Sequence, residues 1–162
     1  MHQTHVIAQH MGYEFISSFT KQLDGVCNID VEEASCGTLL CNSKIYVCSQ
    51  TTKIILKNSQ YLFEKECSSK AQYNPDINRL FSSVAQLNSN LKILGVILTG
   101  IGDDGVLGCE ELSGEATCIT SDEKSSVVYG MPAQAAKRVK NIKIESLDEI
   151  VSTINKFGEN SV

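Results

Sequence analysis

The stretch LKILGVILTGIGDDG, residues 91–105, decides the fold class of this chain. Its first eight residues form the most apolar run in the sequence, and glycine bounds that run. A short run of this composition is typical of a central strand that is buried on both faces of a sheet. A loop rich in glycine follows, and a helical pattern then begins at Val106. The stretch therefore predicts a strand, a tight loop and a helix in succession.

Outward from this stretch, β-rich runs alternate with amphipathic segments. Strands are predicted over His5–Gln9, Val26–Val31, Lys44–Val47, Lys53–Leu56, Tyr61–Phe63, Leu91–Leu98, Ala116–Thr120, Ser126–Tyr129 and Ile142–Ile144. Helices are predicted over Tyr13–Leu23, Asn74–Leu87 with Asn74 as N-cap, Val106–Leu112, Met131–Val139, and Leu147–Phe157 with Gly158 ending it. The closely spaced runs between residues 26 and 63 favour antiparallel hairpins. The whole pattern predicts an α/β fold: an open, doubly wound, mostly parallel sheet with some antiparallel strands and helices on both faces.

Composition narrows the class of protein. The chain has 162 residues, of which 42% are hydrophobic and 20% charged, as expected of one globular domain. No apolar run approaches the ~20 residues that span a bilayer, and the first nine residues do not resemble a signal peptide. The formal net charge of −5 argues against a nucleic-acid partner, which requires a basic surface. The sequence thus predicts a soluble domain without membrane insertion.

Cysteine usage points to a reducing compartment. The seven cysteines are odd in number and include no C-x-x-C pair, so neither a disulfide framework nor a structural zinc site is indicated. Several of them lie in apolar stretches, where a free thiol packs as a small hydrophobic group. We expect reduced, buried thiols in a cytoplasmic protein, at Cys27, Cys36, Cys41, Cys48, Cys67, Cys109 and Cys118.

The glycine loop after the apolar run has two interpretations from its residues alone. Its glycines match G-x-G-x-x-G, and acidic residues follow about twenty positions later, as in a dinucleotide site. However, that fingerprint normally occupies the first strand–helix turn, and Asp103 and Asp104 would repel a pyrophosphate. In the other interpretation, the glycines adopt positive φ in a tight turn and the aspartates cap the next helix.

A histidine and an aspartate are predicted to meet at one edge of the sheet. His10 follows the first strand and Asp104 follows the apolar strand, and the carboxyl ends of parallel strands share an edge. Such a pair could act as the general base and the orienting carboxylate of a hydrolase. A shared metal ion is not indicated, because His5 and His10 would lie about 16 Å apart along a strand. No G-x-S-x-G turn occurs, and Cys36, a conceivable thiol nucleophile, is not followed by a helix.

Four motifs resemble the catalytic domain of the chemotaxis protein-glutamate methylesterases, the CheB family. The family patterns are Q-H-M-P, R-P-S-x-D-x-L-F, L-T-G-M-G-x-D-G-A and D-E-x-[ST]-x-V-V-[FY]-G-M-P, and their order and spacing match from about residue 4 to residue 157. The matching segments are Gln9–Met11, Asn74–Phe81, Leu98–Gly105 and Asp122–Pro132. The chain departs from the family patterns at four positions. It has Gly12 where the pattern has proline, Asn78 where it has aspartate, Ile101 where it has methionine and Val106 where it has alanine.

The resemblance assigns roles to particular residues. It implies that His10 and Asp104 are catalytic and that the backbone amide of Ile101 contributes to an oxyanion hole. It also implies that the loop glycines shape this hole, that Met131 and Gly130 form a wall of the pocket, and that no metal or cofactor takes part. The loop glycines are Gly100, Gly102 and Gly105.

The resemblance also implies an activity. Members hydrolyse glutamyl methyl esters on chemoreceptors, release methanol and can deamidate receptor glutamines, so the implied partners are methylated chemoreceptors in the cytoplasm. The family's serine nucleophile lies in a G-A-S-T-G-G turn on a strand–helix unit just before the histidine strand. Because His10 is only nine residues from Met1, we expect one N-terminally truncated domain over residues 1–162, without this unit and without a receiver domain. We expect the 162-residue chain by itself to be inactive. The alternative is a non-catalytic receptor-binding or regulatory module.

Overall fold

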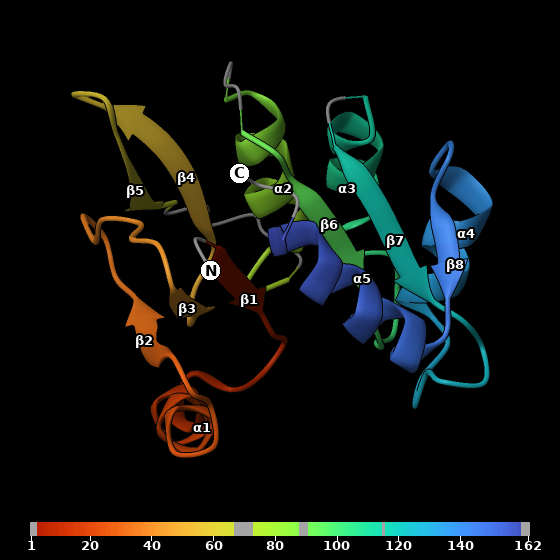
Figure 1. Cartoon of the computed structure of the whole chain (residues 1–162), viewed down its shortest axis with the longest axis horizontal. Helices are drawn as coiled ribbons and strands as arrows, with labels where there is room; N and C mark the ends of the chain where they lie inside the picture. The colour runs from red at the N-terminus through yellow and green to blue at the C-terminus, as the bar shows by residue number, and fades with distance from the viewer. Residues whose placement is uncertain (1–2, 67–72, 88–90, 115, 160–162) are drawn as a thin grey trace.

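The structure, a computed structural model, describes residues 3–66, 73–87, 91–114 and 116–159 (Figure 1). Strands and helices alternate along much of the described chain. The strands are β1 (Thr4–Ala8), β2 (Asp30–Ala34), β3 (Lys44–Cys48), β4 (Thr52–Lys57), β5 (Gln60–Lys65), β6 (Leu94–Ile97), β7 (Thr117–Ser121) and β8 (Lys143–Glu145). The helices are α1 (Tyr13–Asp24), α2 (Ile77–Ala85), α3 (Val106–Leu112), α4 (Met131–Arg138) and α5 (Leu147–Glu159).

The strands form two parallel sheets and one hairpin. One parallel sheet has the order β1-β3-β2, the other has the order β6-β7-β8, and β4 and β5 form an antiparallel pair. β1 and β6 lie next to each other and run in the same direction (Figure 1). Among the described strands, β1 pairs only with β3 and β6 pairs only with β7. The carboxyl ends of both sheets therefore face the same side of the molecule.

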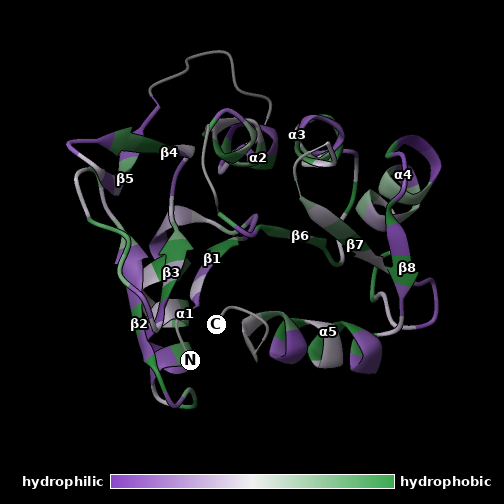
Figure 2. Ribbon diagram, turned by 45° about the horizontal axis from the view of Figure 1, so that its top comes forward, coloured by the Kyte–Doolittle hydropathy of each residue, from purple (hydrophilic) through white to green (hydrophobic). Residues whose placement is uncertain are grey.

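Helices cover both faces, as the doubly wound pattern predicts. Helices α2, α3 and α4 lie on one side of the strands, and α1 and α5 lie on the other (Figure 2). Under α1, the fully buried Ile16 packs with Val31 and Val47 of the sheet. Each large apolar side chain that is buried in this way contributes roughly 1.5–3 kcal/mol to stability. Packing of the helices on the strands thus provides the main support for the loops at the carboxyl edge.

Two core clusters beneath α2–α4 connect the two parallel sheets. One cluster gathers around β6, β7, α3 and α4, and the other around β3, β4 and β5. Helix α2 contributes Ile77 to the first and Leu80 to the second. The side chain of Ala8, at the end of β1, packs against both clusters. These apolar contacts bring together the strand ends from which the site is built.

Helices α2 and α3 cross closely at Gly108. A Cβ atom at this position would lie 2.5 Å from the carbonyl oxygen of Asn78, so only glycine fits the crossing. The Gly108 N–H donates to the side-chain oxygen of Asn78 at 3.0 Å. The start of α2 is therefore fixed against α3, directly beside the glycine loop.

Several predicted elements are wrong in extent or pairing. β2 and β3 pair in parallel rather than as an antiparallel hairpin, and among the described strands only β4 and β5 form a hairpin. Residues 26 and 27 are not in a strand, because the N–H groups of Val26 and Cys27 donate to Leu23 O at the end of α1. The segment Ser126–Tyr129 is not a strand either, and its pairing is limited to an isolated bridge between Tyr129 and Gly100.

Other differences concern the ends of elements. The side chain of Asp76, not of Asn74, caps α2 and accepts from Arg79 N, because Asn74 Oδ1 instead accepts from Thr51 N. β6 begins at Leu94, and within the described strands it lies at an edge rather than in the centre of its sheet. Gly158 is part of α5 and does not end it.

The thiols are only partly buried, and all the described ones are free. Cys48, Cys109 and Cys118 are buried, but Cys36 and Cys41 are exposed because they lie in the loop between β2 and β3. Cys27 is half-buried, and Cys67 lies outside the described residues. The prediction of buried thiols is therefore wrong for the exposed pair.

None of the helices in the described part of the chain is long and apolar enough to cross a membrane.

Candidate active site

The predicted contact between His10 and Asp104 is confirmed. His10 follows β1 and Asp104 follows β6, and His10 Nε2 lies 2.7 Å from Asp104 Oδ2. The Asp104 side chain is fully buried, whereas 29% of the His10 side chain is exposed. The pair therefore combines a sheltered carboxylate with an imidazole that solvent or a substrate can reach.

Backbone donors hold the Asp104 carboxylate from three sides. Oδ2 accepts from Ile77 N at 2.9 Å, while Oδ1 accepts from Asn78 N at 3.1 Å and from Gly105 N at 2.9 Å. Two of these donors belong to the first turn of α2, whose N-terminal end carries a partial positive charge. A buried carboxylate would be costly without such partners. Together with His10, these contacts satisfy both carboxylate oxygens and fix their position.

The start of α2 is itself anchored to Thr51, the residue directly before β4. Thr51 N donates to Asn74 Oδ1 at 3.0 Å, and Asp76 N donates to Thr51 Oγ1 at 3.0 Å. Pro75 between them is fully buried. The donors for Asp104 thus depend on the segment of the Asn74–Phe81 motif, although the sequence analysis gave that motif no role in the site.

The orientation of His10 separates the tasks of its two ring nitrogens. Nε2 faces Asp104, and Nδ1 is the nitrogen on the other side of the ring. A carboxylate beside Nε2 favours the tautomer that carries its proton there and stabilises the imidazolium form. Nδ1 is then free of a proton and can act as a general base.

The glycine loop packs directly against the segment before α4. Gly100 N donates to Val128 O at 3.1 Å, and Met131 N donates to Gly100 O at 2.8 Å. A Cβ at Gly100 would lie 2.3 Å from Met131 Sδ, and one at Gly130 would lie 2.5 Å from Gly100 O. The residues assigned to the pocket wall therefore contact the loop. Met131 is 5% exposed, so it supports the loop from beneath.

Ile101 presents its backbone at the tip of this loop. The residue is 79% exposed, and no hydrogen bond within the described residues uses its N–H. Gly102 and Gly105 on either side of the aspartates have φ of +89° and +83°, a region that favours glycine. The loop conformation thus leaves an amide donor available next to the sheet edge that carries His10 and Asp104.

The two adjacent aspartates have different surroundings. Asp103 is 54% exposed and faces Arg138 Nη1 at 3.5 Å, whereas Asp104 is buried. The predicted cap by its side chain is wrong, because α3 has no side-chain cap and only the backbone oxygen of Asp103 accepts from Val106 N.

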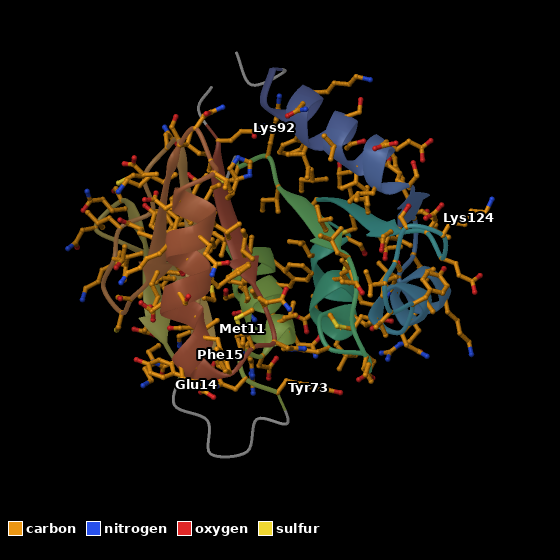
Figure 3. All side chains as sticks on the ribbon, turned by 90° about the horizontal axis from the view of Figure 1, so that it is seen from below. Met11, Glu14, Phe15, Tyr73, Lys92 and Lys124 are labelled. Atoms are coloured by element: carbon orange, nitrogen blue, oxygen red, sulfur yellow. The ribbon has the colours of Figure 1, made fainter. Side chains whose placement is uncertain are left out.

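Sequence reasoning missed Tyr73, whose ring stacks on the imidazole of His10. The ring centroids are 5.3 Å apart and the planes differ by 14°. In Figure 3, Tyr73 lies at the same end of the molecule as Met11, which follows His10. His10 lies in the first motif and Tyr73 directly before the second, and no spacing rule relates the two residues.

The structure does not favour the other chemistries that the residues allow. Within the described part of the chain, no three potential metal-ligating side chains come together. Cys36, the conceivable thiol nucleophile, is exposed in the loop between β2 and β3, and a strand rather than a helix follows it. Burial raises the pKa of Cys48 to about 12, which keeps that thiol protonated and a poor nucleophile. The Asp104 carboxylate accepts from the N–H of Gly105, the residue directly before α3, so it lies at the helix start where a dinucleotide phosphate would otherwise bind.

This α/β fold, with a His–Asp pair at the carboxyl ends of its strands, has the architecture of one hydrolase class. The family described as CheB methylesterase matches residues 1–154, and the chain belongs to this family.

Comparisons with known proteins agree with this membership. The chain is 34% identical over 157 residues to protein-glutamate methylesterase/protein-glutamine glutaminase 2 of Hahella chejuensis, covering 94% of this chain and 42% of that protein. It is 37% identical over 153 residues to protein-glutamate methylesterase/protein-glutamine glutaminase 1 of Photobacterium profundum, and the match covers 92% of this chain and 43% of that protein. The chain thus spans less than half the length of these curated relatives.

A solved structure shares the fold. The crystal structure of the Thermotoga maritima CheB methylesterase catalytic domain matches with a TM-score of 0.83 and 23% sequence identity. The match covers 93% of this chain and 82% of that one. At this level of identity, the likeness establishes the architecture alone.

Proposed function

We propose that this protein provides the base and the orienting acid of a protein-glutamate methylesterase. The observation that carries the proposal is the 2.7 Å contact between His10 Nε2 and the buried Asp104 carboxylate. The family membership and the names of the relatives indicate the substrate class, which is glutamyl methyl esters of proteins. Methylated chemoreceptors as partners and a cytoplasmic location belong to the same proposal.

In the proposed reaction, a serine hydroxyl attacks the carbonyl carbon of the ester while His10 Nδ1 takes its proton. Asp104 stabilises the imidazolium, and the Ile101 N–H donates to the developing oxyanion. Collapse of the tetrahedral intermediate breaks the ester C–O bond, and His10 returns the proton to methanol. Water then attacks the acyl-enzyme with His10 again as base, releasing the glutamate and the free serine.

We propose that the serine comes from a strand–helix unit other than those described here. No described serine hydrogen-bonds to His10. β1 and β6 lie side by side, each with one edge that no described strand pairs with (Figure 1). A parallel strand between them would complete a continuous sheet, and its carboxyl end would lie beside His10 and Asp104.

The test compares the 162-residue chain with a longer version that carries a strand–helix unit and its G-x-S turn ahead of β1. The unit is taken from the native reading frame or, failing that, from the Photobacterium profundum relative. Methanol release from methylated receptor is the readout, and His10→Gln in the longer version should abolish it. Activity of the short chain alone would refute the assignment of the serine. A folded but inactive longer version that still binds receptor would instead establish a non-catalytic receptor-binding module.

A further inference from the structure

The imidazole of His10 is contacted by described residues both at its edge and on a face. Asp104 accepts at the ring edge, and the Tyr73 ring covers one face in a near-parallel stack. A single hydrogen bond fixes a direction but permits rotation of the ring about that bond. An aromatic plane at 14° restricts this rotation, because offset stacks of this kind are favourable.

The loop that carries His10 provides little support of its own. Gly12 follows two residues later, where the family pattern has a proline, and glycine leaves the backbone more freedom. The carbonyl oxygen of His10 accepts one long hydrogen bond, 3.5 Å from the exposed Gln9 side chain. A side chain from another part of the fold is thus well placed to hold the imidazole.

Tyr73 is attached to the anchored start of α2. The next residue, Asn74, binds the backbone of Thr51, and Pro75 after it is fully buried. The Tyr73 hydroxyl also lies over the glycine loop, because a Cβ at Gly102 would come within 2.7 Å of it. One side chain therefore contacts both the candidate base and the loop that presents the Ile101 amide.

We propose that Tyr73 is a positioning residue that fixes the plane of the His10 ring and thereby directs Nδ1 toward the reacting serine. This inference rests on the proposed function for its kinetic consequence, but the positioning itself does not need turnover. It assigns the ring of Tyr73, rather than its hydroxyl, as the part that acts on His10. Misplacement of a catalytic group by about 1 Å can reduce the rate by about a hundredfold.

The first test measures the hydrogen-bonded Nε2 proton of His10 by proton NMR in the 162-residue chain. We expect a resolved downfield signal in the wild type and in Tyr73→Phe, which keeps the stack. In Tyr73→Leu, the signal should broaden or vanish through exchange with water. Tyr13→Leu is the matched control, since this tyrosine on α1 is 62% exposed, and it should keep the signal. Circular dichroism and melting confirm that each variant is folded.

The second test measures kinetics in the longer version that carries the serine. Tyr73→Leu should lower kcat about tenfold to a hundredfold with little change in KM, and Tyr73→Phe should restore most of it. A Tyr73→Leu protein that keeps both the proton signal and kcat would overturn the proposal, as would an equal loss in Tyr73→Phe. A further outcome is a proton signal that is present in the wild type and lost in Tyr73→Leu while the longer version shows no esterase activity. In that case the positioning role stands and the proposed function fails.

Discussion

Replacing Asp104 by asparagine should destabilise the protein even where no reaction is measured. Asp104 accepts four hydrogen bonds in a fully buried position. An asparagine oxygen can replace Oδ1, but its NH₂ group then faces the N–H of Ile77. One buried donor loses its acceptor at a cost of ~1–3 kcal/mol, and the remaining hydrogen bonds lose their ionic component.

Asp104→Asn should therefore lower the free energy of unfolding by about 2–4 kcal/mol in total, which corresponds to a fall in Tm of about 5–15 °C for a domain of this size. Asp103→Asn is the matched control. It removes an exposed ion pair with Arg138, which contributes ~0–1 kcal/mol, so its Tm should change by no more than about 4 °C. Thermal denaturation by circular dichroism measures both.

The same substitution predicts a loss of catalysis by a separate route. The asparagine NH₂ donates to His10 Nε2, so the ring proton moves to Nδ1 and the base is lost. In the longer version that carries the serine, kcat should fall on the order of 10⁴-fold for Asp104→Asn, whereas Asp103→Asn keeps most activity. Equal effects of the two substitutions on Tm or on kcat would refute the assignment of Asp104.

Three further expectations concern the loop, a histidine and the strand edges. Gly102→Ala should lower the free energy of unfolding by more than Gly37→Ala in chemical denaturation, since both have φ near +85° but only Gly102 has Tyr73 above it; equal losses would contradict this. Burial lowers the pKa of His5 below its usual 6.5, so the unfolded chain binds its proton more readily. Stability should therefore fall as the pH drops below about 6.5, and melting of His5→Gln should show a smaller fall. Because β1 and β6 each have an edge that no described strand pairs with, sedimentation velocity should show the 162-residue chain self-associating, and the longer version should be monomeric; a short chain that is monomeric and melts cooperatively would contradict this.

Local sequence signals were sufficient where one segment decides its own structure. The helix predicted over Val106–Leu112 has the observed limits, because the glycine loop and the apolar pattern after it restrict both ends. The contact between His10 and Asp104 was also predictable, since residues after parallel strands share one edge. The motif also assigns only the second of the two adjacent aspartates to the site, and in the structure Asp104 is the buried one while Asp103 is exposed.

Contacts between distant segments could not be obtained in this way. The parallel pairing of β2 with β3 depends on β3 lying between β1 and β2, which spacing does not reveal. The N–H groups of Ile77 and Asn78 that hold Asp104 lie at the start of α2, 26–27 residues before Asp104 in the sequence. Tyr73 is a comparable case, because its ring meets His10 from a distant segment, next to Asn74, which is anchored on Thr51.

The location of the His–Asp contact explains why so many elements support it. His10 extends from the sheet of β1 and Asp104 from the sheet of β6, and no described strand pairing joins these two sheets. The connection depends instead on Ala8, which packs in both core clusters, and on α2, which contributes to both and donates to Asp104. A small displacement between the sheets would stretch the 2.7 Å contact beyond hydrogen-bond range. A strand bonded to both β1 and β6 would prevent that displacement, and the same strand would deliver its carboxyl end to the position that a nucleophile needs. Completing the sheet and completing the catalytic group are thus expected to be one structural event.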